Sequence, residues 1–197
     1  MILTEDFYKQ PAEAAAKALL GKVLVTSAGE GVTKGIIVET EAYIGPEDMA
    51  AHTAGGRRTA RNEAMYRPGG CVYVYTIYGM HTCFNVVTGP EDSGQAVLVR
   101  ALEPLEGMEL MRKRRGVSDI KNLASGPGKL CAAMGIDKSF YGESLTGNRI
   151  RIEDAGASPE IIASKRINVD YAGEWADKLL RFTIKDSPFV SVRRFMV

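Results

Sequence analysis

The chain has 197 residues, 45% of them hydrophobic and 25% charged, which suits an ordinary soluble globular protein that buries its core without disulfides or metal. Its 25 basic and 24 acidic residues leave a formal net charge of +1, so no overall basic field indicates a nucleic-acid partner. The first residues show neither a basic segment nor a long apolar run. We therefore expect no signal peptide or membrane span, a cytoplasmic location and a single domain over residues 1–197.

Cysteine and histidine usage gives no sign of a metal centre. The two histidines, His52 and His81, belong to no H-E-x-x-H or C-x-x-C arrangement, and the three cysteines lack ligand or disulfide spacing. Apolar or small neighbours flank each cysteine, which favours buried, reduced thiols. We therefore expect no catalytic metal, and no cofactor of another kind is indicated.

The pattern of apolar and turn-forming residues predicts a mixed domain. Short turns separate most strands, so the expected fold class is α+β, with a curved, mostly antiparallel sheet, flanking helices and one protruding hairpin. In the helix expected at residues 104–115, Leu105, Met108 and Met111 form one apolar stripe. A short helical turn is expected around Trp175. In chain order, the expected elements are helix 12–20, strands 22–26 and 34–44, hairpin 72–85, strand 95–102, helices 104–115 and 130–134, and strands 149–153, 166–169 and 180–185.

Two charged residues interrupt otherwise apolar strands. In the second strand, alternation places Glu39, Glu41 and Tyr43 on one face. Arg100 lies inside the apolar strand that follows the hairpin. A charge there costs free energy unless it is paired or faces water, so a buried Glu41–Arg100 ion pair and a solvent-facing edge strand are two interpretations. The third is a functional site, in which the carboxylate activates water and the arginine keeps it ionised.

The hairpin carries an unusual number of aromatic side chains. Alternation puts Tyr73 and Tyr75 on one face and Tyr78 on the other. Tyr78, Met80 and His81 fall at or beside the turn, where large side chains either fold back onto the core or touch a partner. Most tyrosine stripes in strands are core packing; the alternative is stacking on a flat ring, which contributes ~1–3 kcal/mol per nucleic-acid base.

Two weak signals suit phosphate groups. Arg57, Arg58 and Arg61 form a local basic patch in a glycine-containing loop, and Lys129 follows the glycine-rich start of a helix. Arginines and helix N-termini both bind phosphates, although a solvated loop is the more usual explanation of such a signal. Together they would bind phosphates locally, although the net charge of the protein does not attract them.

Taken together, several long motifs closely resemble those of the alkyladenine (3-methyladenine) DNA glycosylase family. They occur in the family's order and extend over nearly the whole chain, which makes them far more specific than any single residue above. The matching segments are VETEAYIGPED at 38–48, AH at 51–52, YVYTIYGM at 73–80, RALEP at 100–104, SGP at 125–127, KLC at 129–131 and AGEW at 172–175.

The resemblance implies an enzyme that flips a damaged purine out of duplex DNA. Flipping requires a plug for the vacated stack and a pocket for the extruded base. Tyr78, with Met80 beside it, matches the family's intercalating hairpin tip. Tyr43, His52 and Tyr75 match the residues that sandwich the flipped base. The family's fold is similar to the C-terminal domain of formyltransferases.

The resemblance also implies the chemistry. Glu41 matches the general base that deprotonates water, and Arg100 matches the neighbour that helps position it. Asn85 matches a pocket residue that excludes guanine through its exocyclic amino group. An alkylated purine is a cationic leaving group, so water and stabilisation of an oxocarbenium-like sugar are the main requirements. His81 stands where many relatives carry an aromatic residue.

The resulting prediction is a monofunctional DNA glycosylase of base excision repair. Its expected substrates are alkylated or deaminated purines in double-stranded DNA: 3-methyladenine, 7-methylguanine, hypoxanthine and ethenoadenine. It is expected to act as a monomer, without a cofactor and without cutting the strand. Two alternatives remain: a nucleic-acid-binding domain of the same fold without catalysis, and a hydrolase of free nucleosides.

Overall fold

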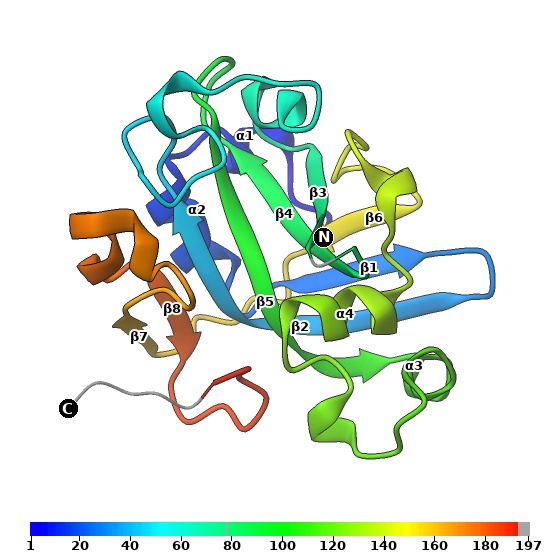
Figure 1. The fold of residues 1–197 in the computed structure, drawn as a ribbon. Helices are drawn as coiled ribbons and strands as arrows, with labels where there is room; N and C mark the ends of the chain where they lie inside the picture. Colours follow the sequence, from blue (N-terminus) through cyan, green and yellow to red (C-terminus); the bar gives the residue numbers. More distant parts are fainter. Residues whose placement is uncertain (78, 193–197) are drawn as a thin grey trace.

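A computed structural model describes residues 1–77 and 79–192 of the chain (Figure 1). Within this part, eight strands form one sheet in which neighbouring strands pair antiparallel. The main strand order is β3-β4-β5-β2-β1-β6, and β8 joins β2 to β7. The α+β prediction is therefore confirmed. The strands are β1 (Val23–Ser27), β2 (Val32–Tyr43), β3 (Val72–Ile77), β4 (His81–Thr88), β5 (Gln95–Glu106), β6 (Ile150–Glu153), β7 (Ile161–Ser164) and β8 (Arg181–Ile184).

Short helices cover the sheet. Helix α2 packs on β2 and β5, and α4 packs on β4 and β5, so apolar residues of both helices join one core cluster with the strands (Figure 1). Thr40 of β2 donates a hydrogen bond of 2.9 Å to the carbonyl of Ala16, which fixes α2 against the strand. The helices are α1 (Glu5–Tyr8), α2 (Ala12–Leu19), α3 (Met108–Arg115) and α4 (Pro127–Met134), with 3₁₀ helices at Ala54–Gly56, Glu63–Tyr66, Ile120–Asn122, Lys138–Phe140 and Asp170–Asp177.

The long strands β2 and β5 form the centre of the sheet and carry the charged residues singled out above. Bulges interrupt their register next to Glu39, yet Glu39 and Glu41 both reach Arg100 on β5. Thr40 and Ala42 lie on the other face, against α2 and the core. The predicted alternation along this strand is confirmed.

The β3–β4 hairpin has the predicted position, and its register pairs Ile77 with His81 across the turn. Gly79 has a φ of +71°, a conformation that suits glycine in such a tight connection. Met80 is 74% exposed, so the tip does not fold back onto the core at this residue. Tyr78, for which intercalation is predicted, lies outside the described residues.

Two predicted elements are wrong. The helix predicted at residues 104–115 begins only at Met108, because β5 continues through Glu106 and Pro104 pairs with Gly35. Leu105 is therefore half-exposed at a strand end instead of contributing to a helical stripe, whereas Met111 is buried. Residues 166–169 form an irregular segment and not a strand, because Asn168 has a φ of +59°, outside the range of a regular strand.

The three cysteines are free and buried, as predicted. Burial raises the pKa of each thiol, that of Cys71 to about 11, so all three are protonated at neutral pH. In the described part of the chain, every helix is too short or too polar to cross a membrane.

Candidate active site

A buried carboxylate stands at the centre of the candidate site. Glu41, near the end of β2, has no solvent exposure. Its Oε1 accepts a hydrogen bond of 2.8 Å from the backbone N–H of Ile167 and lies 3.3 Å from a guanidinium nitrogen of Arg100. Its Oε2 accepts a hydrogen bond of 2.9 Å from the hydroxyl of Tyr43. The proposed ion pair thus exists, and three separate segments hold the carboxylate in one orientation.

A second buried carboxylate, Glu39, holds the same arginine. The Nε of Arg100 donates to Glu39 Oε1 over 2.9 Å, and the Nε of Arg181 on β8 donates to the same oxygen over 2.8 Å. The backbone N–H of Ser191 donates to Oε2 over 2.6 Å. Arg100 therefore bridges two carboxylates, so Glu39 helps to set the position from which Arg100 reaches Glu41.

The charges of this cluster stabilise one another. Burial alone would raise the pKa of Glu39, but Arg100, Arg181 and the N–H of Ser191 outweigh it and lower that pKa. Burial alone would lower the pKa of Arg100, whereas Glu41 and Glu39 together raise it. Glu39 and Arg100 are consequently both ionised at neutral pH, despite their burial.

Another buried ion pair lies behind Tyr43. Both guanidinium amino groups of Arg166 bind Asp48, over 2.5 and 2.8 Å, and neither side chain is exposed. The same guanidinium donates to the carbonyl of Ala42 and lies 4.8 Å from the centroid of the Tyr43 ring. Since Arg166 directly precedes Ile167, this pair fixes both the ring and the amide that contact Glu41.

Aromatic side chains surround a small hollow next to the cluster, which we call the inner pocket. Its volume is about 50 Å³. His52 lies edge-on to Tyr75, with ring centroids 4.5 Å apart, and its Nδ1 is 2.7 Å from the hydroxyl of Tyr73. Tyr73 and Tyr75 share one face of β3, as predicted, with centroids 5.6 Å apart. The aromatic and polar walls are Tyr43, His52, Tyr73, Tyr75, Asn85 and Tyr171.

The protonation states of these walls follow from their surroundings. Burial raises the pKa of Tyr43, and the nearby Glu41 raises it further. Burial likewise raises the pKa of Tyr75. Partial desolvation lowers the pKa of His52, and the positive charges of Arg61 and Arg57 lower it further. At neutral pH the inner pocket therefore presents protonated phenols and a neutral imidazole.

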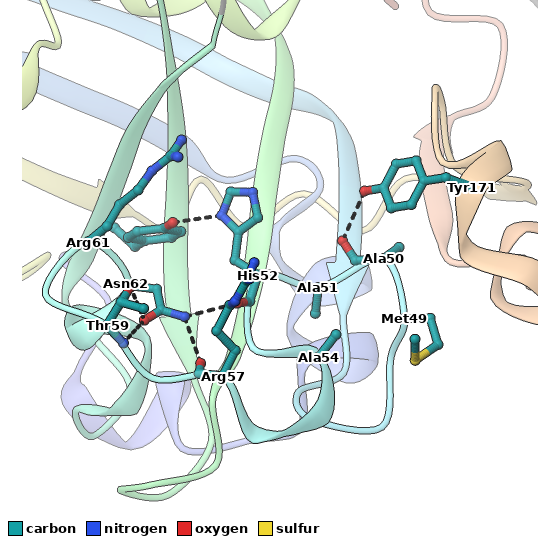
Figure 2. A pocket seen from close by; sticks show the side chains of 11 residues that line it. Met49, Ala50, Ala51, His52, Ala54, Arg57, Thr59, Arg61, Asn62 and Tyr171 are labelled. Carbon is teal, nitrogen blue, oxygen red and sulfur yellow. Dashed lines mark hydrogen bonds between the residues drawn. The ribbon is translucent and has the colours of Figure 1, made fainter.

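Two larger hollows adjoin the inner pocket. The first, which we call the groove, has a volume of about 730 Å³ and runs past Tyr43, Tyr75 and Arg100 to the first turn of α4. The second, which we call the side cavity, has a volume of about 510 Å³ and is shown in Figure 2. His52 and Tyr171 line both of these hollows as well as the inner pocket. All three spaces therefore meet at the candidate site.

The predicted basic residues occupy different environments. Arg57 and Arg61 line the side cavity, and Arg61 donates to the carbonyl of Thr76 over 3.2 Å. Lys129 lines the groove, and its Nζ donates to Asn122 over 2.5 Å. Arg58 is instead held by two carboxylates, those of Glu63 at 2.6 Å and Asp92 at 2.7 Å.

The hairpin side chains lie at the edge of the groove. His81 is exposed and lines the groove beside Gly128, so that a Cβ added to Gly128 would come within 3.2 Å of the His81 Cβ. Asn85, further along β4, is buried and donates from its Nδ2 to the carbonyl of Tyr73 over 3.1 Å. The structure thus brings Asn85 to the inner pocket and leaves His81 outside it.

Sequence reasoning missed several residues that build the site. Strand alternation predicts the face on which Glu39 lies, but no feature of the sequence indicates that Glu39 pairs with Arg100. Arg166 and Asp48 are 118 positions apart, so no local pattern links them. Tyr171 directly precedes the AGEW motif and is the one missed residue that the motif itself could have indicated.

The arrangement fits hydrolysis at a flat aromatic ring. The inner pocket offers ring faces and edges, and the ionised groups next to it can orient water. Among residues 1–77 and 79–192, no group of three or more histidine, cysteine, aspartate or glutamate side chains is arranged to hold a metal ion. The described geometry brings together a carboxylate, an arginine and aromatic walls at one place.

Comparison with known proteins identifies the family. The family model of methylpurine-DNA glycosylases matches residues 6–188, so the chain belongs to this family and is a DNA glycosylase, an enzyme of the repair of alkylated DNA. The human DNA-3-methyladenine glycosylase is 46% identical over 201 residues, which cover 95% of this chain and 67% of the human protein.

Two further relatives extend this comparison. A protein of Natranaerobius thermophilus, provisionally named a 3-methyladenine DNA glycosylase, is 46% identical over 98% of this chain and its own full length. A protein of Encephalitozoon cuniculi, provisionally named a DNA-3-methyladenine glycosylase, is 50% identical over 93% of this chain and 90% of its own length. The family resemblance seen in the sequence motifs is thereby confirmed.

Proposed function

We propose that this enzyme removes alkylated or deaminated purines from double-stranded DNA by hydrolysing the N-glycosidic bond. Its substrates in this proposal are 3-methyladenine, 7-methylguanine, hypoxanthine and ethenoadenine. The observation that carries the proposal is the position of Glu41, which three donors orient directly beside the aromatic inner pocket. The relatives named for 3-methyladenine support the same substrate class.

The flipped base would stack between Tyr43, His52 and Tyr75, which line both the inner pocket and the groove. Such stacking contributes about 1–3 kcal/mol per base and tolerates different purines. Asn85, on the pocket wall, would reject guanine by a clash with its exocyclic amino group. Met80 at the exposed hairpin tip, together with Tyr78, would fill the gap that the base leaves in the duplex.

The proposed reaction needs a water molecule and no covalent intermediate with the protein. Glu41 would take a proton from water as the water oxygen bonds to the sugar C1′, and the base would leave with the electrons of the glycosidic bond. A ring alkylated at N3 or N7 departs as a neutral molecule, whereas hypoxanthine and ethenoadenine, which are neutral in DNA, would take up a proton from water as they leave. Because Arg100 binds both carboxylates, it would hold Glu41 in place. No lysine attacks the sugar, so the strand would remain uncut.

The decisive experiment compares the wild type with Glu41→Gln on duplexes that each carry one of the four lesions. We expect the variant to bind these duplexes and to lose base release, measured as alkali-cleavable abasic sites. A matched control is Glu160→Gln, which alters an exposed ion pair on the surface. Base release by Glu41→Gln at the wild-type rate would refute the assignment. Binding without release by the wild type would favour the non-catalytic alternative.

A further inference from the structure

One wall of the inner pocket is held much less firmly than the others. Tyr171, in the 3₁₀ helix Asp170–Asp177, is 73% exposed although it lines the inner pocket. Its hydroxyl donates a long hydrogen bond, 3.4 Å, to the carbonyl of Ala50 (Figure 2). An aromatic ring exposed to this extent beside a binding pocket is a surface that a partner can cover.

The remaining polar and aromatic walls are fixed by packing or shorter contacts. Tyr43 donates to Glu41 over 2.9 Å and packs against Arg166. The Nδ1 of His52 lies 2.7 Å from the hydroxyl oxygen of Tyr73, and Figure 2 draws this contact as a dashed line from the imidazole. Asn85 is buried and bonded to a backbone carbonyl. A ligand that enters the inner pocket can therefore reposition Tyr171 at lower cost than any of these walls.

The position of Tyr171 also determines what it can touch. It lines the inner pocket, the groove and the side cavity, and thus stands where the three spaces meet. Together with Tyr43, His52 and Tyr75, its ring borders the passage from the groove into the inner pocket. The segment that precedes it contributes the Ile167 amide to Glu41, so the ring and the catalytic carboxylate belong to one connected part of the site.

We propose that Tyr171 is a binding residue that closes over the flipped nucleotide. It thereby raises the affinity for a duplex with a damaged purine relative to the affinity for an undamaged duplex. The inference rests on the proposed function. Tyr171 forms the outer aromatic wall of the inner pocket, and it contacts a base only after that base has left the stack. Its contribution therefore appears in the affinity for duplexes whose purine is flipped, and not in general contact with DNA.

The test measures single-turnover base release from a hypoxanthine duplex at increasing enzyme concentration, together with affinity for the matching undamaged duplex. For Tyr171→Ala we expect the half-saturating concentration to rise about ten-fold, as for the loss of one stacking contact, with an unchanged maximum rate. Affinity for the undamaged duplex should stay as in the wild type. Tyr171→Phe keeps the ring and should behave like the wild type.

The control is Leu179→Ala, which removes an exposed apolar side chain outside the three hollows and should change none of these quantities. An unchanged half-saturating concentration in Tyr171→Ala would overturn the proposal. So would an equal loss of affinity for both duplexes, or a loss confined to the maximum rate. Failure of the proposed function is distinguishable, because the wild type itself would then release no base from any lesion duplex.

Discussion

The buried ion pair between Asp48 and Arg166 makes a quantitative prediction for stability. Asp48→Asn removes the negative charge that faces a fully buried guanidinium, and it places an amide where a carboxylate accepts four hydrogen bonds, two of them from Arg166. Breaking one partner of a buried pair costs about 3–5 kcal/mol, since the other charge remains buried without compensation. For a protein of this size, each kcal/mol shifts the Tm by roughly 2–4 °C. We therefore expect the Tm to fall by roughly 6–20 °C.

Thermal unfolding followed by circular dichroism at neutral pH measures this shift. The matched control is Glu160→Gln, since Glu160 pairs with Lys185 over 2.8 Å with both side chains largely exposed. Such a surface pair contributes about 0–1 kcal/mol, so the control should lower the Tm by at most a few degrees. If the Tm falls by the same amount in both variants, burial does not govern the strength of the Asp48 pair and the reasoning is refuted. The double variant Asp48→Leu/Arg166→Met should have a higher Tm than Asp48→Asn, because it leaves no unpaired buried charge.

Three further predictions follow from the charged and reactive groups. The folded-state pKa of Glu39 lies below its unfolded value, so its stabilisation is complete above about pH 4.3 and is lost as the pH falls through the folded pKa. The urea midpoint of the wild type should thus fall more steeply between pH 5 and pH 3 than that of Glu39→Gln; parallel curves would contradict this. In salt titrations of DNA binding, Arg61→Gln should reduce the slope by about 1, whereas Arg58→Gln, already paired with two carboxylates, should not; equal slopes would remove the distinction. The three buried thiols should react with a thiol reagent only when urea unfolds the protein, and fast reaction of the native protein would show that they are accessible.

Local patterns predicted those parts of the site that one strand can encode. Strand alternation alone placed Glu39, Glu41 and Tyr43 on a common face, and it placed Tyr73 and Tyr75 together on another strand. Both predictions hold because side-chain direction in a strand follows from the backbone, whatever the partner strand. The family motifs then predict that Arg100, His52 and Asn85 lie near Glu41 and Tyr43. In the structure, Arg100 contacts Glu41, and His52 and Asn85 line the inner pocket with Tyr43.

Other features depend on distant contacts that a local pattern does not contain. Pro104 looked like the first residue of a helix, yet its pairing with Gly35 continues β5. Residues 166–169 looked like a strand because Ile167 and Val169 are β-branched, but Asn168 has a φ of +59°, and Arg166 and Ile167 are held by Asp48 and Glu41. In both places tertiary contacts outweigh local propensity, which differs by only about 1 kcal/mol between states.

The contact between Glu39 and Ser191 bridges 152 positions of the sequence. Synthesis on the ribosome proceeds at about 5–20 residues per second, so Glu39 is made roughly 8–30 s before its partner. During that interval the nascent chain already has the strand that carries the carboxylates, but it lacks Arg181 and the segment around Ser191. The buried charge network, and with it the fixed position of Arg100, can therefore form only after residue 191 has left the exit tunnel.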